Sequence, residues 1–279
     1  MSRSRVHRFA LGPLAAALGL ACLVGAAARP AGATARSLIC RPNYDWAVEV
    51  DGAYPKGACF YQTDAQKKFF VDVPSMSDGL LLDLAALKVF TVPRNEIHRN
   101  DGRLTVPADM PPGSTAYAFA IEGPIIQFTA GDRKIRILRD LMRPPLTGPV
   151  SLDALVEDRP EYREGMKNYT PEADSIKILK SYTKPVELEV YFATWCPHCK
   201  VFMPKFLRAV QEANNPKLKL NLVGVPKNFG TEPGPWKGDN IMNIPTVIVK
   251  IDGKEITRLG AHEGTSPEAE LAGILQAVR

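Results

Sequence analysis

Two cysteines separated by two residues give the sequence its clearest chemical signal. Cys196, Pro197, His198 and Cys199 follow an apolar run and open a segment with helical periodicity. A cysteine at a helix N-terminus meets free backbone N–H groups and the positive end of the helix dipole, and both stabilise a thiolate. We therefore expect Cys196 to be the attacking sulfur and Cys199, one turn further on, to resolve the mixed disulfide. Pro197, His198 and the preceding Trp195 are expected to tune this pair.

A metal site is the competing interpretation of these two thiols. A structural zinc site usually needs four ligands, and the only other cysteines beyond the first 35 residues are Cys40 and Cys59, far away in the sequence. We expect no cofactor and no metal, although copper delivery through the two thiolates, with only His198 and Met203 nearby, stays an alternative. Cys40 and Cys59 are expected to form a structural disulfide that stabilises the fold by about 3 kcal/mol.

The residues before position 144 predict a mainly β domain. Short segments rich in β-branched and aromatic residues alternate with turn formers such as Asp51-Gly52, and this spacing is typical of a β-sandwich or small barrel. One helix is expected at 80–87. The predicted strands cover 46–50, 69–73, 88–92, 103–106, 116–121, 125–129 and 134–138.

The segment 144–150 contains three prolines and predicts a stiff linker. The expected organisation is therefore a β-rich domain of unknown role at 36–143, this linker, and an α/β domain at 151–279. In the last of these we expect a helix at 151–168 with Ser151 as N-cap, and a second helix opened by Thr170 and Pro171. Further strands are expected at 186–192, 218–225, 246–251 and 255–259, and further helices at 196–214 and 267–278.

The C-terminal domain resembles the thioredoxin family over about 120 residues. Ala193-Thr194-Trp195-Cys196 is similar to the family's approach to its active site, and Pro204 matches its helix-kinking proline. Ile244, Pro245 and Thr246 resemble the cis-proline loop, which implies that they bind the substrate backbone. The resemblance implies a thioredoxin fold and a protein disulfide oxidoreductase that acts on protein thiols and disulfides.

Two features depart from reducing thioredoxins. The position six residues before Cys196, where thioredoxins carry a buried acid, holds Val190, and Glu189 next to it points to the opposite face of the strand. The Cys-Pro-His-Cys core is similar to periplasmic oxidases of the DsbA type. A stabilised thiolate makes the disulfide a stronger oxidant, so oxidation or isomerisation is favoured. A periplasmic reductase, of the thioredoxin or cytochrome-maturation type, is the alternative.

The first 35 residues have the layout of a secretory signal. A basic start with Arg3, Arg5 and Arg8 precedes an apolar run and a small-residue cleavage site near Ala33. A retained membrane anchor is the alternative. We expect a periplasmic or secreted protein with no stable membrane insertion after cleavage, and with a membrane redox partner. Removing the segment lowers the net charge from +5 to +1, because it holds four arginines and no acid, so nothing points to a nucleic acid.

The remaining polar and aromatic residues receive structural interpretations. The charged residues at 157–167 are expected to form a solvated helix face. Trp236, in the loop 228–238, is expected to pack under its own loop, with a place in the substrate groove as the alternative. His98 and His262 are interpreted as surface residues, and Lys219 stands where thioredoxins have a lysine near the active site.

Overall fold

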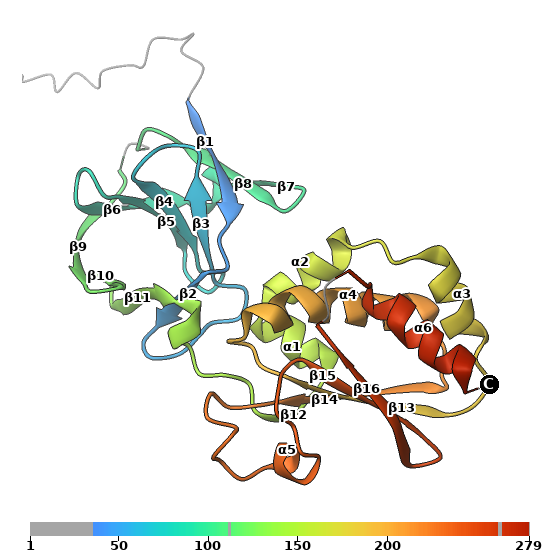
Figure 1. The fold of residues 1–279 in the computed structure, drawn as a ribbon. Coiled ribbons are helices and arrows are strands. Elements are labelled where there is room, and N and C mark those ends of the chain that lie inside the picture. The colour runs from blue at the N-terminus through green and yellow to red at the C-terminus, as the bar shows by residue number, and fades with distance from the viewer. Residues whose placement is uncertain (1–35, 111–112, 262–263, 279) are drawn as a thin grey trace, which may run out of the picture. The chain divides into compact units, whose positions relative to one another are not determined.

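The computed structural model describes residues 36–110, 113–261 and 264–278 (Figure 1). The segment read as a secretory signal, residues 1–35, and His262 lie outside the described residues. No helix in the described part is long and apolar enough to cross a membrane. The described chain contains an N-terminal all-antiparallel β-sheet and a C-terminal α/β layer, as the sequence predicts.

The N-terminal sheet has eleven strands, and all of its pairings are antiparallel. The order is β2-β11-β10-β9-β6-β5-β4-β3-β1-β8-β7. A short 3-10 helix, η1 (Arg94–Glu96), lies between β6 and β7, and a second, η2 (Asp140–Met142), follows the last strand. The strands are β1 (Ser37–Pro42), β2 (Trp46–Val50), β3 (Cys59–Thr63), β4 (Lys68–Asp72), β5 (Asp78–Asp83), β6 (Lys88–Pro93), β7 (His98–Asn100), β8 (Arg103–Pro107), β9 (Ala116–Glu122), β10 (Ile125–Ala130) and β11 (Arg133–Arg139).

The central strands of this sheet are buried on both faces, and this explains the wrong prediction of a helix at 80–87. Alternate side chains enter two cores, so that Leu80 and Leu82 lie in one while Leu81 lies in the other. A run of apolar residues without alternation suits such a strand as well as it suits a buried helix. The segment expected to be a helix at 80–87 is instead the second half of strand β5, which pairs with β4 and β6, followed by a turn at 84–87.

The C-terminal sheet has five strands in the order β12-β14-β13-β15-β16. Only β13 and β14 run parallel. Its strands are β12 (Gly148–Val150), β13 (Val186–Phe192), β14 (Leu218–Gly224), β15 (Thr246–Ile251) and β16 (Lys254–Gly260). The end of the expected linker is thus a strand of this sheet.

Six helices accompany this sheet, namely α1 (Leu152–Asp158), α2 (Pro160–Asn168), α3 (Ala173–Ser181), α4 (Pro197–Ala213), α5 (Pro235–Gly238) and α6 (Pro267–Ala277). The helix expected at 151–168 is two helices, because Arg159 leaves helical geometry before Pro160. Ser151 caps α1 as predicted, accepting a bond from the Ala154 N–H at 3.1 Å. Helix α3 begins later than expected, with Glu172 as its N-cap.

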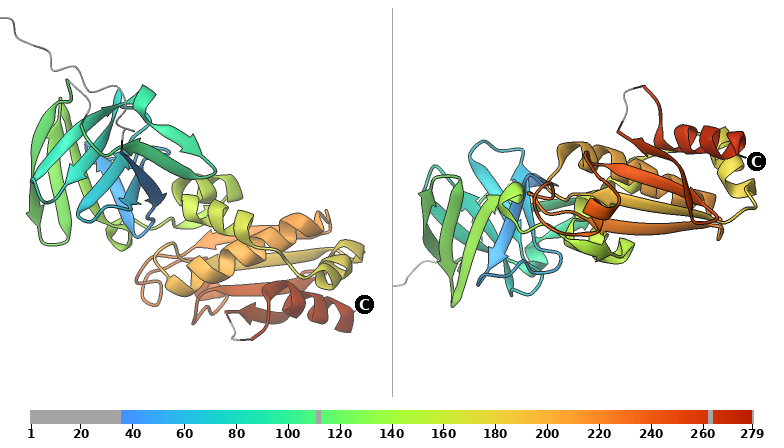
Figure 2. Two further views of the ribbon diagram at one scale, coloured as in Figure 1. Left: turned by 90° about the horizontal axis from the view of Figure 1, so that it is seen from above. Right: turned by 60° about the horizontal axis from the view of Figure 1, so that its bottom comes forward.

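Helices α2, α3, α4 and α6 contact one another in one layer, and Figure 1 shows this layer on one side of the sheet with α5 on the other. Both panels of Figure 2 show strands of this sheet side by side with the helices against them. Helices α2 and α4 approach closely: a Cβ added at Gly165 would lie 2.7 Å from the Pro204 side chain. The glycine thus lets α2 rest directly on the helix that begins at the cysteine pair.

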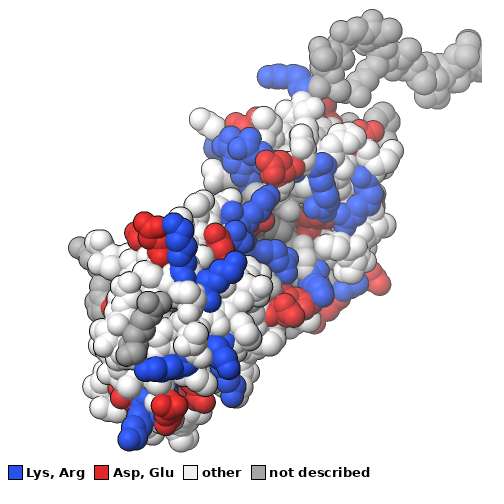
Figure 3. All heavy atoms as spheres, turned by 90° about the vertical axis from the view of Figure 1, so that its right-hand side faces the viewer, with Lys and Arg blue, Asp and Glu red and all other residues white. Residues whose placement is uncertain are grey.

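Charged side chains of both signs are interspersed on the face drawn in Figure 3. Figure 3 shows Lys and Arg side chains close to Asp and Glu side chains over one face of the molecule. Exposed ion pairs include Lys177–Asp174 at 2.9 Å and Arg208–Glu212 at 3.0 Å. Such pairs each contribute at most about 1 kcal/mol, so the cores described above carry most of the stability.

Candidate active site

The cysteine pair lies where β13 ends and α4 begins. Cys196 is the N-cap residue of α4, Pro197 is its first helical residue, and Cys199 lies inside the first turn. Pro at this position costs no helix bond and fixes the backbone for helix entry. Cys196, which its place at the start of a helix leads one to expect as the exposed sulfur, is itself buried at 5% exposure, because its thiol packs against the Ile244 carbonyl and donates to it at 3.7 Å. Cys199 is completely buried, and its sulfur accepts a bond from the Ala193 N–H at 3.4 Å.

The pKa values of the two thiols are shifted in opposite directions. A hydrogen bond from the Cys199 thiol, with smaller contributions from the Cys199 and His198 N–H groups, lowers the pKa of Cys196 to about 6 against the opposing effect of burial. The same bond and burial raise the pKa of Cys199. Cys196 is therefore the thiolate at neutral pH and Cys199 keeps its proton.

The predicted substrate loop lies beside Cys196. The Ile244–Pro245 peptide bond is cis, and Thr246 begins β15. These residues line a groove of about 640 Å³ together with His198 and the exposed Met242. Its far wall is the neighbouring strand β16.

The tuning residues have distinct surroundings. His198 is exposed and lines the groove, and Pro197 is exposed at the start of α4. Trp195 is half-buried, and its indole N–H donates to the Val225 carbonyl at 3.3 Å. That bond fixes the loop before Cys196 to the end of β14. Lys219 is exposed on β14, and Trp236 is buried under its own loop, donating to the Glu232 carbonyl at 3.1 Å.

No acid lies on β13 behind the cysteines. Val190 is completely buried, and the carboxylate of Glu189 binds Lys250 at 2.6 Å and the Tyr191 hydroxyl at 3.2 Å. Glu189 therefore serves the opposite face of the strand, as the sequence predicts. Cys199 receives no proton acceptor from this strand.

The charged residues at 157–167 do not all form a solvated face, which corrects that expectation. Arg159 is 2% exposed and binds the carboxylates of Asp140 and Asp158. The Glu161 side chain is 15% exposed and lies 3.6 Å from the Lys200 ammonium, which also binds Asp140 at 2.8 Å. The sequence signal for this cluster was weak, because its members come from three separate segments.

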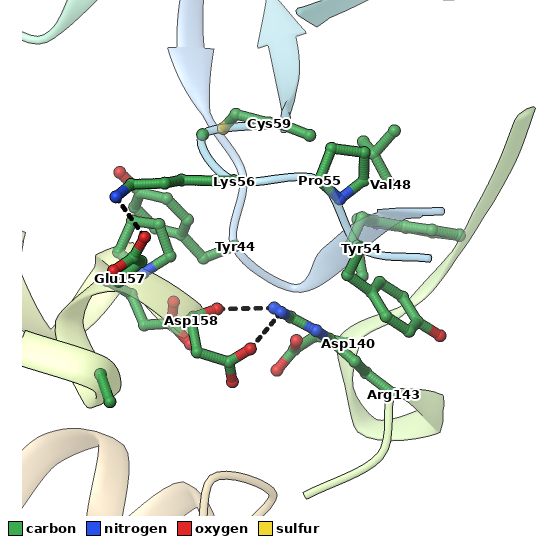
Figure 4. Close-up of a pocket in the computed structure, with 17 residues that line it drawn as sticks. Tyr44, Val48, Tyr54, Pro55, Lys56, Cys59, Asp140, Arg143, Glu157 and Asp158 are labelled. Atoms are coloured by element: carbon green, nitrogen blue, oxygen red, sulfur yellow. Dashed lines mark hydrogen bonds and ion pairs between the residues drawn. The ribbon is translucent and has the colours of Figure 1, made fainter. Parts of the chain in front are cut away.

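A cavity of about 330 Å³ opens beside this buried cluster (Figure 4). Figure 4 shows Arg143 directed toward Asp158, whose carbonyl and carboxylate it binds, and Lys56 paired with Glu157. Asp140 and Glu161 also line the cavity. The cluster next to the cysteine helix is therefore within reach of solvent through this opening.

The expected disulfide between Cys40 and Cys59 is not formed. Cys40 lies opposite Thr63 in the β1–β3 pairing, and Cys59 is four residues before Thr63 on the same strand. Four residues of strand amount to about 13 Å, well beyond the reach of a disulfide. Cys40 lies in the β-domain core and Cys59 is half-buried against it, and burial raises the pKa of each to about 12.

Within the described residues, no group of three or more His, Cys, Asp or Glu side chains is placed to hold a metal ion. His98 is exposed on strand β7.

Comparison with known proteins identifies the C-terminal part. Residues 172–277 match the family model described as Thioredoxin. A search of curated proteins finds no match. Similar solved structures include a protein of unknown function from Pseudomonas aeruginosa (13% identity, TM-score 0.34, 43% of this chain and 82% of that one). They also include the thioredoxin of Trypanosoma brucei brucei (15% identity, TM-score 0.27, 39% and 87%).

Proposed function

We infer that the thioredoxin domain, with its close Cys196–Cys199 pair, carries out thiol-disulfide exchange with protein thiols and disulfides as partners. We propose that this pair makes the chain an exported protein disulfide oxidoreductase. The observation that carries the proposal is the asymmetry of the pair: the thiol whose pKa is lowered contacts the carbonyl of Ile244 in the cis-proline loop, and the thiol whose pKa is raised lies completely buried behind it.

The exchange begins with attack by the Cys196 thiolate on a substrate disulfide. An S–S bond to Cys196 forms, the substrate S–S bond breaks, and one substrate thiolate leaves. The Cys199 thiolate, formed by loss of its proton, then attacks the Cys196 sulfur and releases the second substrate thiolate. Two electrons pass from the cysteine pair to the substrate. Oxidation of a substrate dithiol is the same sequence in reverse.

Oxidation or isomerisation is the favoured direction. A lowered pKa of Cys196 stabilises the reduced pair, and a couple whose reduced form is stabilised is a stronger oxidant. The Cys-Pro-His-Cys core, similar to that of DsbA-type oxidases, supports the same direction. A periplasmic reductase of the thioredoxin or cytochrome-maturation type remains the second candidate, because Ile244 before the cis-proline is thioredoxin-like.

Export and a membrane redox partner are part of the proposal. The basic, apolar and small-residue layout of residues 1–35 supports cleavage and a periplasmic or secreted location. The mature protein would then work where thiols oxidise and need a catalyst for correct pairing. The β-sheet domain would position the substrate or the redox partner.

The direct test is Cys196→Ser, assayed for reduction of insulin and for oxidation of a reduced model protein. Both activities should fall to background. Cys40→Ser is the matched control, because its thiol is buried in the other domain, and it should keep full activity. Persistence of either activity in Cys196→Ser would refute the assignment. A reduction potential near that of cytosolic thioredoxins, about −270 mV, would instead establish the reductase.

A further inference from the structure

Exposed apolar side chains recur around the active site. Among the described residues, eight large apolar side chains are at least 40% exposed, and four of these belong to elements that carry or contact the cysteine pair. Val201 lies on α4, and Met242 lines the groove beside the cis-proline. Leu141 and Met142 are two of the three residues of η2. Exposed apolar side chains that gather at one place mark an interaction surface.

A buried ion pair anchors η2 to the active-site helix. The Asp140 carboxylate is 6% exposed and accepts a bond from the Lys200 ammonium at 2.8 Å. Lys200 follows Cys199 directly and lies one turn beyond Cys196 on α4. The other oxygen of Asp140 lies 3.5 Å from the buried Arg159 side chain. Because these buried charges depend on one another for compensation, η2 keeps a fixed place beside the start of α4.

A second anchor joins η2 to the Trp195 side of the active site. The Lys227 ammonium donates to the Leu141 carbonyl oxygen at 2.6 Å. Lys227 lies on the segment that leaves β14, whose main chain also accepts the bond from the Trp195 indole. The two anchors use the Asp140 side chain and the Leu141 main chain, so the Leu141 and Met142 side chains remain exposed, at 55% and 40%.

The surface of η2 is continuous with the proposed substrate site. On α4, Pro197 follows Cys196 directly, and it is exposed together with Val201 one turn further on. Val201 in turn follows Lys200, the residue that holds η2. One turn of α4 and one ion pair therefore separate Cys196 from η2, a span of at most about 20 Å. An extended polypeptide covers that span in about six residues.

Neither the region 172–277 that matches the thioredoxin model nor the groove beside the cis-proline includes η2. We propose that η2 is a second substrate-binding element, at which Leu141 and Met142 bind a bulky apolar side chain of the substrate within about six residues of its reactive cysteine. This inference rests on the function proposed above and names its substrate class, a polypeptide with a leucine-like residue at that spacing. The groove binds the residues next to the substrate cysteine, and η2 binds the more distant side chain.

The two side chains of η2 determine the kind of residue that they bind. Leucine offers no hydrogen-bonding group and the methionine thioether is only a weak acceptor, so the contact gains free energy by burying apolar surface. Methionine is unbranched and adapts to side chains of different shape. This surface should therefore accept leucine, isoleucine, methionine or phenylalanine and discriminate against charged residues.

The test uses synthetic peptides with one cysteine in a host rich in serine and glycine, linked through a disulfide to thionitrobenzoate. The Cys196 thiolate attacks the peptide sulfur, an S–S bond forms between them, and thionitrobenzoate leaves as a thiolate that absorbs at 412 nm. A single leucine replaces serine at successive positions before or after the cysteine. With the full reduced chain, the release should be about tenfold faster than with the serine host when leucine stands about four to six residues from the cysteine on one side.

Substitutions in η2 should remove this preference for leucine. In the double variant Leu141→Lys, Met142→Lys, the ratio of the rates for the leucine and serine peptides should fall to about one, because ammonium groups replace the apolar contact. Leu87→Lys is the matched control, since Leu87 is 59% exposed and lies in the turn between β5 and β6, whose strands pair only within the N-terminal sheet. It should keep the ratio of the native chain.

The outcomes are distinct. A ratio that stays at the native value in the double variant would overturn the proposal. A native chain without a leucine preference at any position would overturn it too, because η2 would then serve a second copy of the chain or the redox partner. Failure of the proposed function gives another result, in which the native chain releases thionitrobenzoate from every peptide no faster than Cys196→Ser does. If the double variant fails to fold, as judged by circular dichroism, Leu141→Ala with Met142→Ala decides.

Discussion

The reduction potential of the cysteine pair should change its dependence on pH near pH 6. Below the pKa of Cys196, reduction takes up two protons with two electrons, and the potential falls by about 59 mV per pH unit. Above it Cys196 stays a thiolate, only one proton is taken up, and the slope halves to about 30 mV. The raised pKa of Cys199 keeps the second proton bound.

The size of the effect follows from the pKa of Cys196, which falls from 9.0 to about 6. At pH 7 the reduction potential of this couple should be about 30 mV higher than that of a couple with ordinary thiols. The reason is that pH 7 lies about one unit above the lowered pKa and still below the ordinary one, so the reduced form gains about a factor of ten from ionisation of Cys196. The same pKa shift also sets how the stability of the reduced chain depends on pH. A lowered pKa means that the folded reduced chain gains stability over the unfolded chain as the pH rises from about 6 toward 9, and loses that gain as the pH falls through 6.

The measurement is equilibration of the full chain in glutathione buffers from pH 5 to 8.5, with the oxidised fraction read from the mass shift after alkylation. Thiolate absorbance at 240 nm gives the Cys196 titration independently, with Cys196→Ser as the blank. Cys40 and Cys59 do not interfere, because burial raises their pKa values to about 12. A single slope near 59 mV per unit from pH 5 to 8.5 would refute the assignment of Cys196 as the thiolate.

Three other substitutions test the packing around the site. Gly165→Ala should lower the free energy of unfolding by about 1–2 kcal/mol in urea titrations, because its Cβ would lie 2.7 Å from Pro204. Gly273→Ala is the control, since open space surrounds it, and it should raise the free energy of unfolding by about 0.5–1 kcal/mol. Equal effects of the two substitutions would contradict the close α2–α4 contact. Gly260→Ala should slow exchange with protein substrates by about tenfold while sparing the Cys196 titration, because its Cβ would lie 2.9 Å from the carbonyl oxygen of the cis-proline; insulin turnover measures this. Arg159→Met should cost about 3 kcal/mol in the same urea assay, since it leaves buried carboxylates under-neutralised, and a loss below about 1 kcal/mol would show that solvent reaches them.

The sequence predicted local chemistry and local structure well. The Cys-Pro-His-Cys motif after an apolar strand sufficed to predict a helix start, and the helix does begin at Pro197 with Cys196 as its cap. Short segments rich in β-branched and aromatic residues, set between turn formers, predicted most strands of both sheets. These features depend on neighbours within a few residues, which a sequence displays directly.

The predictions from sequence were wrong where the structure depends on strand register or on an element being buried on both of its faces. Leu80 and its neighbours looked helical because an apolar run does not reveal that two cores will bury opposite sides of one strand. Cys40 and Cys59 looked like a pair, but the β1–β3 register sets them four residues apart.

The site itself divides in the same way. Sequence alone predicted Cys196 as the attacking sulfur, because its place at a helix start, three residues before Cys199, can be read from neighbouring residues. Only the tertiary structure brought Asp140, Glu161 and Lys200 together, since these residues are separated by many positions in the chain and meet through the packing of α2 on α4. From the sequence, charged residues on a helix are expected to face solvent. Whether they are buried depends on which element packs over that face, and only the tertiary structure shows this.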